Sequence, residues 1–95
     1  MYVQKEYIKD NKKYILKFFI SQRRYKKYRV DIYLNNKFIK SVHFGDRRYE
    51  HYYDQIGLYP DLNHNDMERL QLYYKRHKKN YPDFSADFFS KRFLW

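Results

Sequence analysis

Several residue types that usually carry structure or chemistry are scarce in this sequence of 95 residues. It has no cysteine, which excludes disulfides, thiolate metal ligands and a thiol nucleophile. Glycine and proline occur twice each, and alanine occurs once, at Ala86. With so little glycine, a phosphate-cradling loop has almost nothing to be made from. We therefore expect a protein of a reducing compartment whose stability depends on its hydrophobic core.

Long hydrophobic runs are also missing. No stretch approaches the roughly 18 apolar residues that a membrane-spanning helix needs. The first six residues include Lys5 and Glu6, and they lack the apolar segment typical of a signal peptide. We expect a soluble protein with no membrane partner.

Aromatic residues dominate what is present. The chain has thirteen tyrosines, eight phenylalanines and one tryptophan, and 43% of its residues are hydrophobic. Disordered chains lack such large side chains, because little else offsets the entropy lost on ordering. The length suits one hydrophobic core, so we expect a single small basic domain over residues 1–95.

The charge is unevenly distributed. The net charge is +10, and residues 1–48 contain fourteen Lys or Arg against four Asp or Glu, whereas residues 49–95 contain seven of each. Charge that served only solubility would not segregate in this way. The first half of the chain therefore predicts a surface for an anionic partner.

The first half also has the two-residue period of β-strands. Residues 14–20 alternate, with Lys17 opposite the apolar set, and residues 28–34 repeat the pattern. Asn35-Asn36 then predicts a tight hairpin turn, because both residues tolerate positive φ. Residues 38–44 form the return strand, with Phe38, Val42 and Phe44 on one face. An earlier strand over residues 2–8, followed by a turn at Asp10-Asn11, completes an antiparallel β-meander of three to four strands within residues 2–44.

The second half predicts helices after an irregular segment. Residues 46–64 form that segment, with a short helical turn at residues 49–55. Asn65 and Glu68 match a capping box, which predicts a helix over residues 66–79. Its expected inner face is Met67, Leu70, Tyr73, Tyr74 and His77. Ser85 caps a short aromatic helix over residues 85–94, so the expected fold class is α+β, with the sheet packed by these helices.

Catalysis finds little support in the sequence. It has no metalloprotease, nucleotide-binding or serine-hydrolase motif, so we expect no enzyme activity, no cofactor and no small-molecule substrate. A metal site would have to use His51, Asp54 and His64, but their spacing matches no familiar site, and we expect no bound metal. His77 is interpreted as a partly buried histidine that bonds a neighbouring polar group, with a pH-sensitive or ligand-contacting role as the alternative.

A basic loop is the sharpest functional feature. The stretch from Ser21 to Arg29 has five cations around two tyrosines, and two arginines after the last strand extend it. Cations pair with phosphate oxygens, and tyrosines stack on unpaired bases. The alternative is a solvated hairpin loop in a lysine-rich chain. The predicted site for nucleic acid or an acidic partner is Arg23, Arg24, Tyr25, Lys26, Lys27, Arg29, Arg47 and Arg48.

The C-terminal residues form the second candidate surface. They are strongly apolar, whereas most chain termini are polar and frayed. Such side chains either complete the core, which the sheet requires as a lid, or contact another protein. The predicted protein-interface residues are Phe89, Phe93, Leu94 and Trp95.

Three sequence pieces occur in an order that resembles a known family. They are Val42-His43-Phe44-Gly45, then Glu68-Arg69 with Tyr73 or Tyr74 and Arg76-His77-Lys78-Lys79-Asn80, then Phe88-Phe89-Ser90-Lys91-Arg92-Phe93-Leu94-Trp95. This order is similar to a largely uncharacterised family of small basic proteins of large DNA viruses and tailed phages. The resemblance covers residues 42–95. It implies a viral protein, located in the virion or in the host cytoplasm.

Two functions follow as hypotheses. The first is a minor structural component of the virus particle, which docks on larger capsid, portal or tail proteins and turns its basic face to acidic protein or packaged DNA. The alternative is a free protein that binds nucleic acid without sequence preference, through backbone phosphates, during infection.

Overall fold

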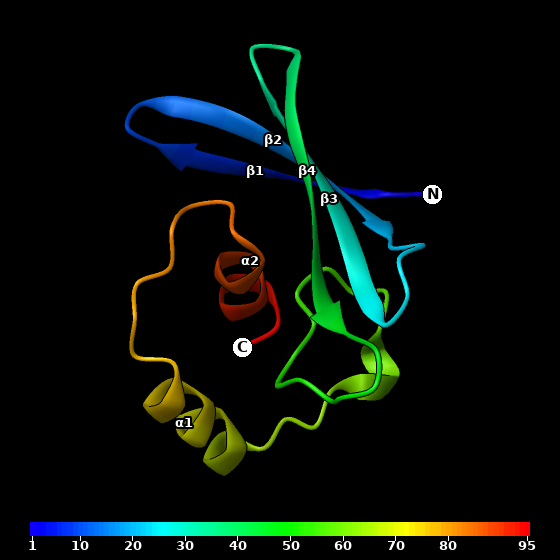
Figure 1. Ribbon diagram of the computed structural model, residues 1–95, viewed down its shortest axis with the longest axis vertical. Coiled ribbons are helices and arrows are strands. Elements are labelled where there is room, and N and C mark those ends of the chain that lie inside the picture. Colours follow the sequence, from blue (N-terminus) through cyan, green and yellow to red (C-terminus); the bar gives the residue numbers. More distant parts are fainter.

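Four antiparallel strands occupy the first half of the chain. The computed structural model describes residues 1–95, and its sheet has the order β1-β2-β3-β4 (Figure 1). The strands are β1 (Val3–Lys9), β2 (Lys12–Ile20), β3 (Lys26–Leu34) and β4 (Lys37–Asp46). With two helices in the second half, α1 (Met67–Arg76) and α2 (Ala86–Phe93), the predicted α+β meander is confirmed.

The two outer hairpins close through two-residue turns. Asp10 and Asn11 have φ values of 53° and 62°, and Asn35 and Asn36 have 52° and 63°. Asn and Asp tolerate this left-handed region better than other side chains, and two such residues in succession match the right-handed twist of the flanking strands. Both predicted turns are therefore confirmed.

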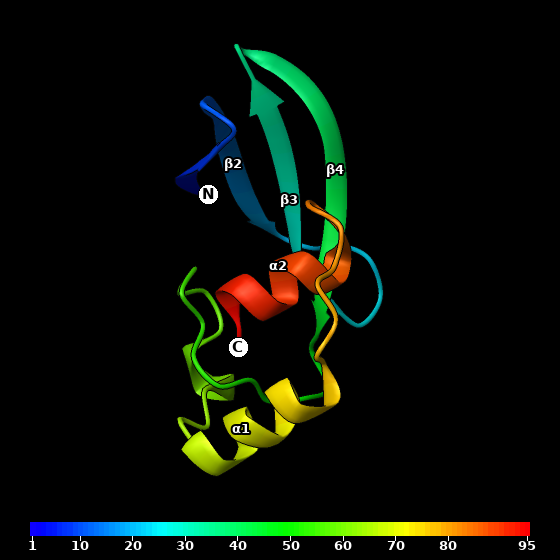
Figure 2. The ribbon, with the colours of Figure 1, turned by 90° about the vertical axis from the view of Figure 1, so that its left-hand side faces the viewer.

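The core lies between one face of the sheet and α2. Six inward side chains of β2, β3 and β4 have no exposed surface, and α2 adds Phe89 and Phe93. Figure 2 shows α2 beside the strands, in contact with β4. Ser85 caps α2, as predicted, because its hydroxyl accepts a hydrogen bond from the Phe88 amide over 3.1 Å. Each fully buried phenylalanine contributes about 1.5–3 kcal/mol. The sheet side of the core comprises Leu16, Phe18, Tyr28, Val30, Ile32 and Phe44.

This packing corrects the expectation for the C-terminal surface. Phe89, Phe93 and Leu94 are buried in the core, so they are not available as a protein interface. Trp95 is half-buried against α1. These side chains cover the apolar face that β2, β3 and β4 form together.

A β-bulge in β4 overturns the predicted position of Phe38. Ile32 pairs with Lys40 whereas Tyr33 pairs with Phe38, so Ile39 is an extra residue on β4. An inserted residue reverses the alternation of faces between the side chains before it and those after it. Phe38 therefore lies beside Tyr33 on the face opposite Val42, with 56% of its surface exposed.

The segment between β4 and α1 is held by backbone hydrogen bonds, among them those of Tyr52 and Tyr53 to the Leu94 carbonyl, and by side chains. Residues 49–55 are not helical, in contrast to the prediction, and the only helical turn of this segment is the 3-10 turn η1 (Pro60–Leu62). The Asp54 carboxylate organises the segment by accepting hydrogen bonds from the Tyr28 hydroxyl and from the Ile56 and Tyr59 amides. These contacts join residues far apart in the sequence, which a local pattern does not reveal.

Helix α1 is shorter than predicted and begins one residue later. Asp66, not Asn65, is its N-cap and accepts from the amides of Glu68 and Arg69 over 2.9 and 3.3 Å, because Asn65 is in the left-handed region. The helix ends at Arg76, before the expected Lys79. Neither helix is long and apolar enough to cross a membrane.

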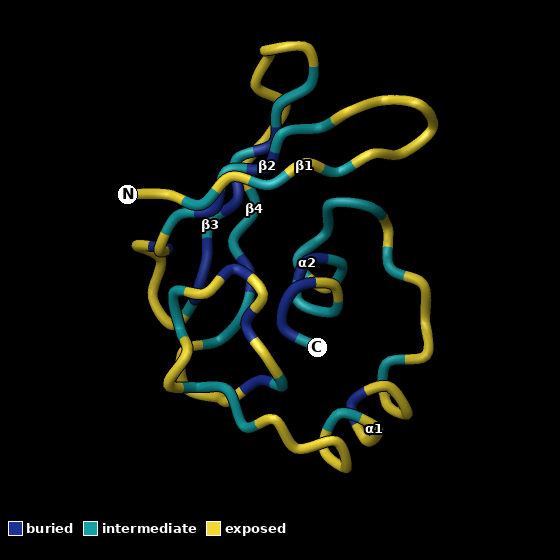
Figure 3. The backbone as a smooth tube through the Cα atoms, turned by 180° about the vertical axis from the view of Figure 1, so that it is seen from behind, coloured by how far each residue is buried: buried dark blue, intermediate teal, exposed yellow.

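The expected inner face of α1 is correct at three of its five positions. Tyr73 is the only buried residue of the helix; Leu70 and His77 are half-buried, and Met67 and Tyr74 are exposed. Figure 3 shows α1 mostly exposed at the edge of the molecule, far from the buried strands. The helix contacts the rest of the domain mainly through stacked rings.

Candidate functional site

Two loops meet at one end of the sheet and form a surface that we call the basic end. They are the β2–β3 loop, with Arg23, Arg24 and Tyr25, and the turn after β4, with Arg47 and Arg48. The Arg47 amide donates to the Tyr25 carbonyl over 2.8 Å, which joins the two loops directly. The structure therefore brings together predicted site residues that are more than 20 positions apart in the sequence.

The Arg47 side chain joins the two loops of the basic end through hydrogen bonds. Its guanidinium donates to the Lys26 carbonyl over 2.6 Å and also to the Ser21 carbonyl. Both donors are thus directed at the backbone of the β2–β3 loop. The guanidinium of Arg47 thus holds this loop in place.

Tyr25 lies between two arginines. The guanidinium carbons of Arg24 and Arg48 are 4.7 and 4.1 Å from the centre of its ring, and Arg24 also donates to its hydroxyl over 2.7 Å. Cations over a tyrosine ring are attracted by its negative face. Arg48 is further bonded to Asp46 over 2.7 Å, and this hydrogen bond lowers the pKa of that carboxyl to about 2.

His43 lies on β4, where the basic end meets the sheet. The Ser21 hydroxyl and Nδ1 of His43 are joined by a hydrogen bond of 2.7 Å. Desolvation lowers the pKa of His43, and the positive charges of Arg23, Arg29 and Lys26 lower it further. Arg29 pairs with His43 and Lys26 pairs with Asp46 across β3 and β4, so these cations lie at the same end of the sheet.

Lys27 was predicted as a site residue, but its side chain is buried. Only 2% of its surface is exposed, and its Nζ donates to Nδ1 of the buried His51 over 2.8 Å. Burial lowers the pKa of Lys27 to about 8, an effect that the charges of Asp54 and Asp46 partly offset. A lysine in this position is not available for phosphate.

The three residues considered for a metal have other partners. Nε2 of His51 donates to the Asn63 side-chain oxygen over 2.6 Å, Asp54 bonds Tyr28, and Nδ1 of His64 accepts from the Asp66 amide. No group of three or more His, Cys, Asp or Glu side chains is arranged to hold a metal ion. His77, which the sequence analysis singled out, accepts from the Tyr81 hydroxyl over 2.8 Å and stacks on Tyr73.

The face of the sheet opposite α2, which we call the open face, was missed by the sequence analysis as a site. This face carries two pairs of aromatic rings. The ring centres of Tyr2 and Phe19 are 5.2 Å apart, and those of Tyr33 and Phe38 are 5.7 Å apart. Arg29 lies 4.2 Å above the Phe19 ring. A signal existed in the sequence, since Phe19 and Tyr33 occur at the strand positions expected to be polar.

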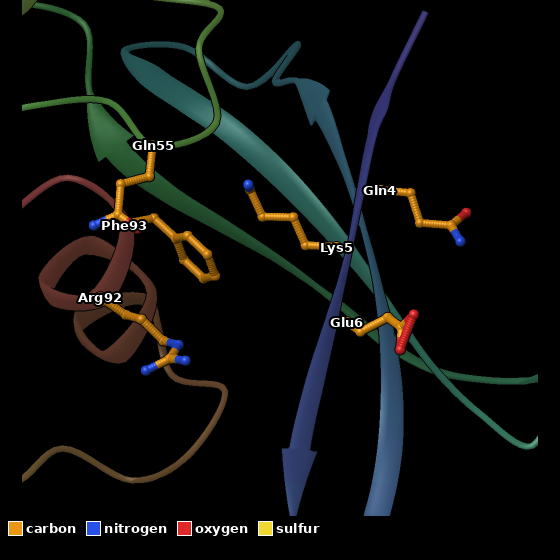
Figure 4. A pocket seen from close by; sticks show the side chains of 6 residues that line it. All are labelled: Gln4, Lys5, Glu6, Gln55, Arg92 and Phe93. Carbon is orange, nitrogen blue, oxygen red and sulfur yellow. The ribbon is translucent and has the colours of Figure 1, made fainter.

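The largest hollow of the molecule lies elsewhere. It has a volume of about 550 Å³ beside the edge strand β1 and the C-terminal end of α2. Figure 4 shows that Lys5 points into it from β1, whereas Gln4 and Glu6 point to the other side of the strand. One lysine and Arg92 of α2 are too few convergent groups to define a ligand, so the basic end remains the better candidate.

The fold and these surfaces define a small α+β protein whose meander sheet has one face covered by α2 and one face open. No protein-family model matches the chain, and comparison with curated proteins and with solved structures finds no similar protein. The resemblance to viral proteins therefore stays a prediction.

Proposed function

We propose that this protein works by binding, without catalysis, and that its basic end binds the phosphate backbone of nucleic acid without sequence preference. The observation that carries the proposal is the joining of the β2–β3 loop to the turn after β4 by hydrogen bonds of Arg47, which brings Arg23, Arg24, Lys26 and Arg48 to one end of the sheet. Cations gathered at one place release condensed counterions when phosphate binds, which is the main source of nonspecific affinity.

The pairing of the charges favours this function. Arg23, Arg24 and Lys26 form no ion pair with any carboxylate, whereas Arg29 and Arg48 bond Asp31 and Asp46. A cation without a carboxylate partner does not have to break an ion pair to bind phosphate. The loop that carries them is held by Arg47, so little order has to be gained on binding.

The test is the salt dependence of DNA binding. We expect the affinity to fall steeply with salt, and Arg23→Gln, Arg24→Gln and Lys26→Gln together to reduce the slope by roughly 0.7–0.9 for each phosphate that is no longer neutralised. The matched control is Lys75→Gln, Lys78→Gln and Lys79→Gln, which removes the same charge near α1. An equal effect of both triple variants would assign binding to net charge and overturn the basic end as the site.

A second candidate is a structural role in a virus particle, in which the protein docks on a larger capsid, portal or tail protein. The observation that favours it is the apolar surface of α1, where Met67 and Leu72 are about half exposed. Exposed apolar side chains grouped on one element are typical of protein interfaces. Since Phe89, Phe93 and Leu94 are buried, such docking would use α1.

Purified particles test this second role. A structural component is expected at fixed copy number in particles, and Leu72→Gln, on the exposed side of α1, should remove it from them without affecting DNA binding by the free protein. Absence of the wild-type protein from particles would exclude this role.

A further inference from the structure

The open face carries two pairs of aromatic rings with one lysine between them. The Nζ atom of Lys17 is 5.4 Å from the ring centre of Tyr2, in the first pair, and 4.7 Å from that of Tyr33, in the second. All three side chains come from different strands or from the N-terminal residues beside β1. The four rings contact one another, Lys17 and Arg29, and none of them stacks on a ring of α1, α2 or the segment between β4 and α1. Tyr2 and Phe38 are exposed, and Phe19 and Tyr33 are half-buried.

We propose that the open face binds single-stranded nucleic acid, with unpaired bases stacked on the two ring pairs and the intervening phosphate bound by Lys17. This inference rests on the proposed function, since it names which nucleic acid the basic end serves. Any base can stack on an aromatic ring, so such a surface selects for strands with free bases and not for sequence.

The exposure of the rings fits this use. Phe38 and Tyr2 have 56% and 47% of their surface exposed, so both rings are accessible to a base from solvent. A hollow of about 240 Å³ lies beside Lys17 and Tyr33, lined also by Gln4, Ile15 and Asn36. The amides of Gln4 and Asn36 offer hydrogen-bond donors and acceptors to the edge of a base bound there.

The charges of the open face make its occupant anionic. Its two carboxylates are already paired, Glu6 with Lys13 over 2.8 Å and Asp31 with Arg29 over 3.1 Å. Lys17 has no carboxylate partner. The face is therefore positive at its centre and continues through Arg29 to the basic end.

Continuity between the two surfaces sets a path for the strand. Arg29 contacts the Phe19 ring of one pair, and its charge also acts on His43 at the basic end. A strand that stacks on the open face can thus extend its phosphates to Arg23 and Lys26 without leaving positive surface. A duplex can use only the basic end, because its bases are already stacked on one another.

The experiment compares single-stranded and duplex DNA of the same length. We would measure the anisotropy of labelled oligothymidylate and of a duplex, each of about 12 nucleotides, with wild type, Phe38→Ala and Tyr33→Leu. Each variant is expected to weaken single-strand binding by roughly 5-fold to 100-fold and to leave duplex binding unchanged. Ile8→Ala is the matched control, since Ile8 is 69% exposed on the same face and is not aromatic.

The outcomes separate this inference from the proposed function. If Phe38→Ala and Tyr33→Leu bind single strands like wild type, while the basic-end variants lose both ligands, the stacking surface is wrong and the proposed function stands. If wild type binds neither ligand, both fail. If Phe38→Ala instead changes the sedimentation of the protein alone, the open face is a contact between copies of this chain and the inference is overturned. Thermal unfolding of each variant checks that the sheet is intact.

Discussion

The Nζ atom of Lys27 donates a hydrogen bond to Nδ1 of His51, and both side chains are buried. Nδ1 must therefore be the unprotonated nitrogen of a neutral His51, with the proton on Nε2, where it is donated to Asn63. Burial lowers the pKa of both groups. A charged lysine is thus held in the interior against the cost of its desolvation, which gives stability a measurable pH dependence.

The pH dependence of unfolding should carry the signature of Lys27. Its pKa is about 8 in the folded state against 10.5 for an ordinary lysine, so the unfolded chain binds more protons between these values. Stability therefore rises with pH, by about 1–2 kcal/mol from pH 8 to pH 9.5. The rise in stability is expected only up to pH 9.5. Burial raises the pKa values of Tyr28 and Tyr73 above 10.0, so at higher pH these tyrosines lose their protons more readily in the unfolded chain and favour unfolding.

Replacement of Lys27 by methionine isolates this contribution. Lys27→Met keeps the apolar stem but has no proton to lose, so the rise in the free energy of unfolding between pH 8 and pH 9.5 should disappear in urea titrations. Lys26→Met, at the neighbouring position, is the control and should retain the rise. If Lys27→Met retained it too, the titrating group would be a different one.

Gly45 should tolerate no side chain. Its φ is +75°, and a Cβ atom there would lie 3.0 Å from Cβ and Cδ of Lys27 and 3.2 Å from Leu94. Gly45→Ala is expected to lower the free energy of unfolding by about 1–3 kcal/mol, from backbone strain and from displacement of the buried lysine. Gly57→Ala is the matched control, because Gly57 also has positive φ but no atom within 4 Å of its Cβ position. A smaller loss at Gly45 than at Gly57 would show that the Lys27 contact is unimportant.

Trp95 should determine whether α1 stays docked. Its ring is parallel to that of Tyr73, with centres 4.4 Å apart, and Tyr73 in turn stacks on His77. In Trp95→Ala we expect the amides of residues 70–76 to lose protection from hydrogen exchange while those of β2 and β3 keep it. Phe93→Ala, which removes a core ring, should reduce protection throughout. Global loss of protection in Trp95→Ala would mean that the stack is part of the core.

The sheet could be predicted from the sequence because its signals are local. Alternation of apolar residues and the turns at Asp10-Asn11 and Asn35-Asn36 act over a few positions. The start of α1 was missed by one residue because Asn65 and Asp66 are both good caps, and only Asp66 has a capping conformation. The bulge at Ile39 depends on pairing across strands, and the segment around Asp54 depends on its distant partner Tyr28. Neither leaves a local signal.

The basic end could be predicted in outline because its signal in the sequence is also local. Its cations are adjacent in the sequence, so their number was visible, but what each one does was not. Lys27 is buried because Gly45 leaves room for it, and Arg47 binds the backbone of a loop more than 20 residues away. The open face needed two facts together, namely the strand alternation at Phe19 and Tyr33 and the bulge that turns Phe38 to the same side.

His43 should make nucleic-acid binding stronger at low pH. Its pKa in the free protein is lowered by desolvation and by Arg23, Arg29 and Lys26, with Asp31 the only nearby group that raises it. A bound phosphate reduces the field of these cations, so the pKa of His43 rises in the complex and a proton is taken up. Because binding is coupled to this proton uptake, the affinity of the protein for nucleic acid increases as the pH falls. We expect a gain of roughly 3-fold to 10-fold between pH 7.5 and pH 5.5.

His43→Gln provides the decisive comparison, since its amide can accept the Ser21 hydrogen bond without binding a proton. Dissociation constants measured across this pH range should become nearly constant in the variant. His77→Gln, which changes a histidine of the α1 region, should retain the dependence of wild type. A pH dependence that survives His43→Gln would mean that phosphate does not approach His43, and it would move the binding surface away from the meeting point of the basic end and the open face.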